Sequence, residues 1–175
     1  MNNTVIIGNV LGLIGSLLMV GIGFIHKKNY ILIGQILQFI VMGIGNLVLG
    51  GVSGFVSDMT GVLRNLYFLR WKTSKRAIVF FLLLQVVVAG ISMVLLGFKW
   101  RELLPIFATT LFTWKLDTKK ESELKIILNI CQLMWLVYDI VIMNYTTAFF
   151  DVLTICSNFV GMMRALKKEK MSESL

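Results

Sequence analysis

Residues 57–76 have the sequence SDMTGVLRNLYFLRWKTSKR, and this stretch decides how the rest of the chain is interpreted. Its first part is apolar enough to enter a bilayer, yet it contains Asp58, Arg64 and Asn65. A charged side chain at the bilayer centre costs roughly 2.5–3.5 kcal/mol on insertion scales, so such residues face a protein interior or a water-filled cavity. The stretch therefore predicts a membrane helix that turns one polar face inward.

Composition extends this prediction to the whole chain. Of the 175 residues, 57% are hydrophobic and the mean hydropathy is +0.83, whereas soluble domains are roughly 45–50% apolar. Several apolar runs of about 20 residues are long enough to cross about 30 Å of hydrocarbon. No basic segment precedes the first run, which favours a retained span over a signal peptide. We expect an all-α, polytopic membrane protein with one membrane domain over residues 1–175.

The apolar runs divide into seven expected transmembrane helices. They cover residues 5–25, 30–52, 55–69, 77–98, 103–116, 126–143 and 146–163. Every lysine and arginine except Lys99 and Arg101 then falls on one side of the membrane. The positive-inside rule places the N-terminus outside and the C-terminus, with a tail at 164–175, in the cytoplasm. The net charge of +8 is thus explained by topology and does not indicate a nucleic-acid partner.

A set of polar positions recurs after 93 or 94 residues. The matched pairs are Gln35 and Asn129, Gln38 and Gln132, Asn46 and Asp139, Asp58 and Asp151, and Asn65 and Asn158. Positions i and i+7 share one face of a helix, so each half of the chain has a matching polar face. Residues 5–69 and 103–163 would form two three-helix repeats joined by a linker helix at 77–98. This 3+1+3 parallel repeat predicts a substrate site between the copies.

Ten side chains are candidates for contact with a solute at mid-membrane. They are Gln38, Asn46, Asp58, Asn65, Gln132, Trp135, Tyr138, Asp139, Asp151 and Asn158. Several alternatives stay open: the carboxylates could be hydrated at the outer interface, Trp135 could only pack, and the amides could join helices at about 0.6 kcal/mol each. Arg64 could pair with a carboxylate inside the bundle or extend to the cytoplasmic surface.

No metal, nucleotide or haem signature is present, so we expect no cofactor and no metal site. Cys131 and Cys156 lie in apolar runs without ligand spacing and are interpreted as small buried side chains. His26, the single histidine, stands beside lysines and is interpreted as an interfacial residue. The expected partners are the lipid bilayer, a small polar solute and, given the amount of lipid-facing surface, further copies of the chain.

Two segments carry a resemblance to a known family. LRNL at 63–66 and ELLP at 102–105, with TW at 113–114 and Trp135 before YD at 138–139, resemble the bacterial YgjV family of inner membrane proteins over nearly the whole chain. The resemblance implies a multi-pass protein of the bacterial inner membrane. It also implies an architecture similar to that of the SWEET and PnuC transporters. In SWEETs an asparagine on each third helix of the repeat contacts substrate, which implies such a role for Asn65 and Asn158.

The leading functional hypothesis is a transporter or facilitator for a small polar metabolite, with alternating access between two three-helix bundles. The alternative is a non-transporting sensor or assembly factor whose polar residues are structural. A third class is the intramembrane aspartyl proteases, because Tyr138-Asp139 resembles the YD motif of these enzymes. No GxGD motif accompanies it, and two close aspartates sharing a proton would be needed, so we expect no enzyme.

Overall fold

A computed structural model describes residues 3–22, 28–71, 74–115 and 121–173. This part of the chain contains seven α-helices, one 3₁₀ helix and no strand, in agreement with the predicted all-α class. The helices are α1 (Asn3–Ile22), α2 (Lys28–Val48), α3 (Val52–Arg70), α4 (Lys75–Leu96), α5 (Leu103–Trp114), α6 (Glu121–Val141) and α7 (Tyr145–Glu173), and the 3₁₀ helix is η1 (Trp100–Glu102).

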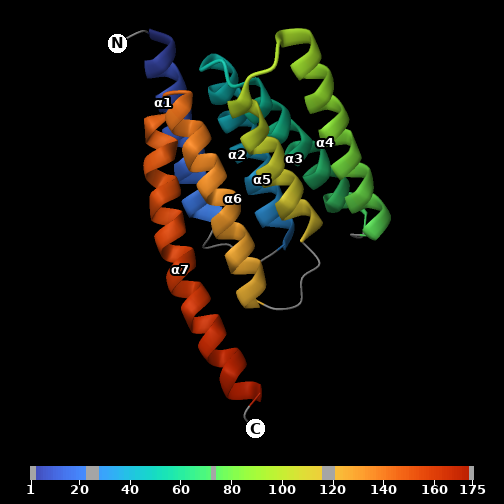
Figure 1. Ribbon diagram of the computed structural model, residues 1–175, viewed down its shortest axis with the longest axis vertical. Helices are drawn as coiled ribbons and strands as arrows, with labels where there is room; N and C mark the ends of the chain where they lie inside the picture. Colours follow the sequence, from blue (N-terminus) through green and yellow to red (C-terminus); the bar gives the residue numbers. More distant parts are fainter. Residues whose placement is uncertain (1–2, 23–27, 72–73, 116–120, 174–175) are drawn as a thin grey trace.

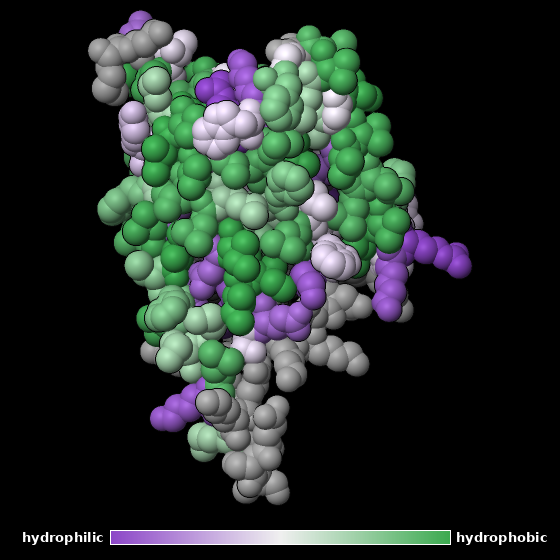
Figure 2. Space-filling view, in the orientation of Figure 1, coloured by the Kyte–Doolittle hydropathy of each residue, from purple (hydrophilic) through white to green (hydrophobic). Residues whose placement is uncertain are grey.

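The distribution of polar and apolar side chains is that of a protein surrounded by lipid. Large hydrophobic residues are outside: Val94 is 84% exposed and Leu95 is 76% exposed on α4. Figure 2 shows a broad apolar band along the bundle, with hydrophilic atoms gathered mainly above and below it. The interior is polar instead, and α3 alone buries Ser53, Ser57, Asp58, Thr60, Arg64 and Asn65. Water would favour the reverse arrangement, whereas hydrocarbon favours this one.

Among the described residues, four helices are long and apolar enough to cross a membrane by length and composition. These segments are Asn3–Ile22, Asn29–Val48, Lys75–Leu95 and Tyr145–Met163. The other three helices differ for two reasons. α5 has 12 residues, or roughly 18 Å at 1.5 Å per residue, while α3 and α6 contain the polar side chains that face inward.

The helices form two groups with a peripheral helix. In the N-terminal group α2 packs against α1 and α3, and in the C-terminal group α6 packs against α5 and α7. The groups meet where α1 contacts α7 and where α3 contacts α5. α4 packs on α3 and α5 at the edge of the bundle, while the two chain ends lie at opposite ends of it (Figure 1).

The turns between α2 and α3 and between α6 and α7 have the same backbone hydrogen bonds 93 residues apart. Each turn passes through one residue with positive φ, Gly50 at 76° and Met143 at 64°. The left-handed conformation is strained for a side chain such as that of methionine and free of strain for glycine. The matched bonds are Gly50 N to Leu47 O with Met143 N to Ile140 O, and Gly51 N to Asn46 O with Asn144 N to Asp139 O.

Several helix ends differ from the expected spans. α2 ends at Val48, ahead of the predicted end at 52, and α3 begins at Val52, ahead of the predicted start at 55. α6 begins at Glu121, ahead of the predicted start at 126, and α7 continues to Glu173 through the predicted tail. The apolar run marks the part of a helix suited to lipid, while backbone hydrogen bonding extends the helix into water. The described part of α1 ends at Ile22, so the expected end of this span at residue 25 lies outside the described residues, as does His26.

α4 is attached to the bundle by one polar side chain. Ser74 caps its first turn by accepting a hydrogen bond from Ala77 N at 3.2 Å. Gln85, buried in an otherwise apolar helix, donates from Nε2 to Ser57 Oγ at 3.3 Å. α4 is therefore joined to α3 by a buried hydrogen bond, in addition to the edge-to-face packing of Phe81 on Phe68.

Candidate functional site

A cavity of about 190 Å³ lies between the two helix groups. Its wall is formed by α1, α2, α3, α5, α6 and α7, and the described residues of α4 contribute nothing to it. Its volume exceeds the roughly 10–15 Å³ that a single water requires by more than tenfold. The cavity can therefore hold a small solute or several waters.

Seven of the ten candidate residues line this cavity. They are Gln38, Asn46, Asp58, Gln132, Trp135, Asp139 and Asp151. The wall also includes side chains that the sequence did not single out as solute ligands, namely Ser57, Arg64, Thr109, Cys131 and Thr147. Polar residues from both halves of the chain thus meet at one place inside an apolar-surfaced bundle.

Three candidates are not among the wall residues. Asn65 is buried against α2, where its Nδ2 donates to Gln35 Oε1 at 3.0 Å. Asn158 lies half-buried on α7, and Tyr138 is fully buried beyond the cavity at the start of α3. A helical face can be read from sequence, but the neighbouring helix that covers part of that face cannot. The role that the family resemblance implies for Asn65 and Asn158 therefore has no counterpart in the cavity wall.

The acidic residues of the cavity form two matching pairs of helix–helix contacts. Asn46 Nδ2 donates to Asp58 Oδ2 at 3.0 Å and joins α2 to α3. At the equivalent place between α6 and α7, the Asp139 and Asp151 carboxyls lie within hydrogen-bonding range of each other. Since carboxylates only accept, a hydrogen bond between these two acids requires one proton between them.

Two acceptor oxygens of the wall have no donor among the described residues when Asp139 is ionised. They are Asn46 Oδ1 and Asp151 Oδ2, on side chains that are 2% and 3% exposed. The other oxygen of Asp151 accepts from Gln132 Nε2. A buried polar atom without a partner costs about 1–3 kcal/mol. The two oxygens therefore favour a solute or water that donates hydrogen bonds.

Arg64 is buried in the wall without an acidic partner. It is 8% exposed, so it does not extend to the surface, and its Nη1 donates to Thr113 Oγ1 on α5 at 3.2 Å. Neither of the ion pairs Arg101–Glu102 and Lys115–Glu123 involves Arg64, which bonds to a threonine, so among the described residues neither alternative for Arg64 is realised. One of its five N–H donors is accounted for by Thr113.

Trp135 and Gln38 complete the polar part of the wall. The Trp135 ring meets Tyr138 edge to face, with centroids 5.8 Å apart and planes at 86°. Gln38 Nε2 donates to Met42 Sδ at 3.4 Å, which is a weak acceptor. Both side chains line the cavity, and neither makes a strong hydrogen bond in these two contacts.

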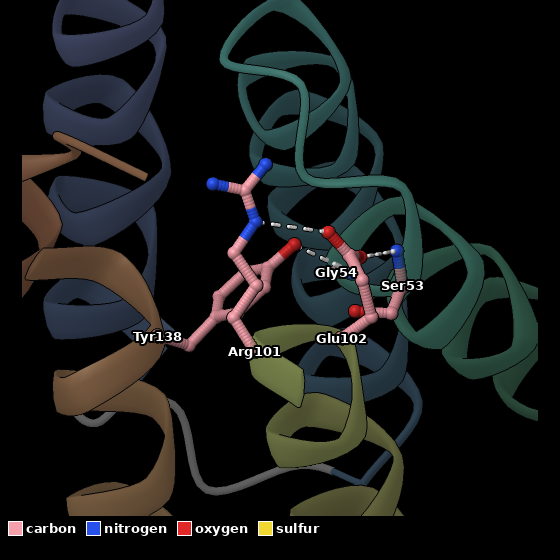
Figure 3. Close-up of polar contacts among 5 residues, drawn as sticks. All are labelled: Ser53, Gly54, Arg101, Glu102 and Tyr138. Atoms are coloured by element: carbon pink, nitrogen blue, oxygen red, sulfur yellow. Dashed lines mark hydrogen bonds and ion pairs between the residues drawn. The ribbon is translucent and has the colours of Figure 1, made fainter. Parts of the chain in front are cut away.

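Polar contacts join the two helix groups at one end of the bundle (Figure 3). Glu102 Oε2 accepts from Ser53 N at 2.8 Å, in the first turn of α3, and Glu102 Oε1 lies 3.3 Å from Arg101 Nε. Gly54 N, one residue further along, donates to the Tyr138 hydroxyl at 3.0 Å. Two N–H groups in the first turn of α3 thus donate to side chains from the C-terminal half of the chain.

A second cross-group cap lies at α7. Asn9 Oδ1 accepts from Thr146 N at 3.0 Å and from Thr146 Oγ1 at 3.1 Å, and Asn9 Nδ2 donates to Met143 O at 2.8 Å. Asn9 precedes Glu102 by 93 residues, and Thr146 follows Ser53 by the same number. Sequence reasoning cited Glu102 only within the ELLP segment of the family resemblance and did not single out Asn9, although the two residues are separated by the same offset of 93 residues.

Comparison with known proteins identifies one family. A model of the Imp-YgjV family, described as bacterial inner membrane protein, matches residues 6–169. No curated protein and no solved structure gives a significant match.

Among the described residues, no group of three or more His, Cys, Asp or Glu could hold a metal ion.

Proposed function

The chain belongs to the Imp-YgjV family of bacterial inner membrane proteins, and from this premise we propose that it is a transporter or facilitator for a small polar metabolite. We further propose that its seven helices all span the membrane as a 3+1+3 parallel repeat of the kind found in SWEET-type carriers. The two helix groups would be the repeats, α4 the linker, and the cavity between them the substrate site.

Three sets of contacts support the repeat. The α2–α3 and α6–α7 turns share their hydrogen bonds at a spacing of 93 residues. The cross-group caps by Asn9 and Glu102 are related by the same spacing. If α1, α2 and α3 correspond to α5, α6 and α7, the α1–α7 contact corresponds to the contact between α5 and α3. Both contacts are present. A two-fold relation between parallel copies would produce this correspondence.

The observation that carries the proposed function is the polar cavity between the groups. It is lined by three carboxyls and several amides from four helices, inside a bundle whose surface is apolar. Two buried acceptor oxygens of the wall, Asn46 Oδ1 and Asp151 Oδ2, have no hydrogen-bond partner among the described residues, and the buried Arg64 guanidinium is bonded to the Thr113 hydroxyl and to no acid. Intramembrane polar groups of this kind mark solute pathways.

The orientation suggests how access would alternate. If the N-terminus faces outside, as the lysine and arginine distribution favours, the Glu102 and Asn9 contacts lie on the outer side of the cavity. Rocking one group against the other would break these contacts and expose the cavity outward. The conformation described here would then be the one closed to the outside.

The test is ligand-dependent stabilisation followed by flux. Detergent-purified protein is screened by thermal shift against sugars, nucleosides, vitamins and amino acids. A ligand at 100 times its Kd adds about 2.7 kcal/mol of apparent stability. We expect a compound whose effect is lost in Asp58→Asn but kept in the control Asn158→Ala, and which crosses proteoliposome membranes containing wild type. Absence of any shift and any flux would favour the sensor or assembly role instead.

One observation favours a second candidate, an intramembrane aspartyl protease. Asp139 and Asp151 are close enough to share a proton, as a catalytic dyad requires. However, Gln132 already donates to Asp151, and Asn144 Nδ2 lies 3.4 Å from Asp139 Oδ1, so each carboxyl of the pair already has an amide donor beside it. Incubation with fluorogenic transmembrane peptides decides the matter: we expect no cleavage, and cleavage lost in Asp151→Asn would establish the protease.

A further inference from the structure

We propose that the solute of the cavity is a small zwitterion, whose ammonium group binds among Asp58, Asp139 and Asp151 and whose oxyanion binds Arg64. This inference rests on the proposed function and adds the substrate class. It depends on two features of the wall: acidic acceptors that need a donor, and a buried cation that needs an anion.

The acidic part of the wall is suited to an ammonium group. Its carboxyls come from three helices, α3, α6 and α7, and converge on one cavity. When Asp139 is ionised, Asn46 Oδ1 and Asp151 Oδ2 accept no hydrogen bond from any described residue. An ammonium has three donors and no acceptor, which matches a wall of acceptors, and its charge compensates ionised carboxyls. A neutral hydroxyl would satisfy one acceptor and leave the charge unbalanced.

Arg64 supplies the opposite charge further along the same helix. It follows Asp58 by six residues, or roughly 9 Å of helix at 1.5 Å per residue, and its side chain lines the same cavity. No carboxylate of the described residues lies within ion-pair distance of its guanidinium. The planar fork of donors binds carboxylate and phosphate groups bidentately. An oxyanion on the solute would compensate this buried charge.

The middle of the cavity fits the short body of such a solute. Gln38 and Gln132 project amides into it, and Trp135 offers a ring that attracts cations at its face. Phe39 and Phe112 add apolar surface for a hydrocarbon segment. The volume of about 190 Å³ limits the solute to a small molecule. Amino acids and short betaines combine the two charges, the apolar body and the size.

The experiment uses ligands that differ only in charge. Purified full-length protein is titrated with ω-amino acids from glycine to 6-aminohexanoate and with L-alanine. For each length the matched amine and carboxylate are included, for example butylamine and butanoate for 4-aminobutanoate, together with neutral polyols. We expect at least one zwitterion to bind ten times more tightly than both of its single-charge analogues. The best chain length then reports the separation of the two binding groups.

Two variants separate the roles of the charges. Arg64→Gln should weaken zwitterion binding at least tenfold while binding of the matched amine stays equal or improves. Asp58→Asn should weaken the zwitterion and the amine but leave the carboxylate unaffected. Asn158→Ala, outside the cavity wall, serves as the control and should bind as wild type. If Arg64→Gln does not fold, Arg64→Lys replaces it. Because an ammonium cannot bind an oxyanion bidentately, Arg64→Lys should weaken binding of the zwitterion while binding of the matched amine stays unchanged.

The outcomes distinguish this inference from the proposed function. Tighter or equal binding of a neutral polyol, or of a single-charge analogue, overturns the zwitterion assignment while the transporter remains supported. Failure of every ligand class to bind or to cross proteoliposome membranes overturns both. Binding of a zwitterion that neither Arg64→Gln nor Arg64→Lys changes also overturns the assignment, because the anion would then be held elsewhere.

Discussion

At the scale of single residues, the molecule depends on polar side chains that reach across from one helix group to the other. Glu102 and Asn9 each accept from the first turn of a helix in the opposite group. The first backbone N–H groups of a helix have no partner within it, so a side chain from elsewhere can satisfy them. In hydrocarbon such a cap is worth more to the fold, because no water replaces it.

Glu102→Ala is expected to lower stability. The substitution leaves Ser53 N and Arg101 without their shared acceptor, which should cost about 1–3 kcal/mol. Thermal unfolding of the purified variant in detergent measures this as a fall in apparent Tm. Glu123→Ala is the control, because its ion pair with Lys115 is only partly buried and pairs near the surface contribute about 0–1 kcal/mol. Equal Tm values for the two variants would contradict the cap.

At the scale of helices and turns, small residues decide how closely the groups approach. A Cβ placed on Gly12 of α1 would lie 2.5 Å from both Asn144 Oδ1 and Thr147 Oγ1. These two atoms belong to the start of α7, so α1 can pack there only because Gly12 has no side chain. Close helix approach at small residues is the usual packing mode in membranes.

Gly12→Leu should therefore separate α1 from α7 and destabilise the protein by about 1–3 kcal/mol, as overpacking does. Gly21→Leu is the matched control on the same helix, since no atom lies within 4 Å of its added Cβ. Apparent Tm in detergent separates the two. A Gly12→Leu variant as stable as Gly21→Leu would mean that the α1–α7 contact is looser than described.

The equivalent turns predict substitutions of opposite sign. Met143 has φ of 64°, so Met143→Gly should relieve strain and raise stability by up to about 1 kcal/mol. Gly50 has φ of 76° in the matching turn, so Gly50→Ala should lower the free energy of unfolding by about 1–2 kcal/mol. Both are measured by thermal unfolding. Changes of the same sign at the two positions would argue against equivalent turns.

At the scale of the whole molecule, the proposed topology places the two chain ends on opposite sides of the membrane. Alkaline phosphatase fused after Gly50 or Gly97 should be active outside the cytoplasm, and green fluorescent protein fused after Glu173 should fluoresce inside. The matched fusion of phosphatase after Glu173 should be inactive. Active phosphatase at Glu173 would reverse the orientation, and with it the assignment of the Glu102 and Asn9 contacts to the outer side.

The amino-acid sequence by itself determined the membrane environment, the helices and the polar faces. Apolar runs specify which segments prefer lipid, and helical periodicity specifies which side chains share a face, because both properties are local. The seven expected helices and seven of the ten candidate residues in the cavity wall follow from these local properties.

Only the tertiary structure decided which faces meet. Asn65 shares a helix face with Asp58, yet Gln35 covers Asn65 while Asp58 remains in the cavity wall. Glu102 belongs to the ELLP segment that marks the family, but its role as the cap of α3 follows only from the packing of α5 against α3. These outcomes depend on contacts between residues far apart in the chain. Such contacts arise from the packing of whole helices, and no local pattern specifies them.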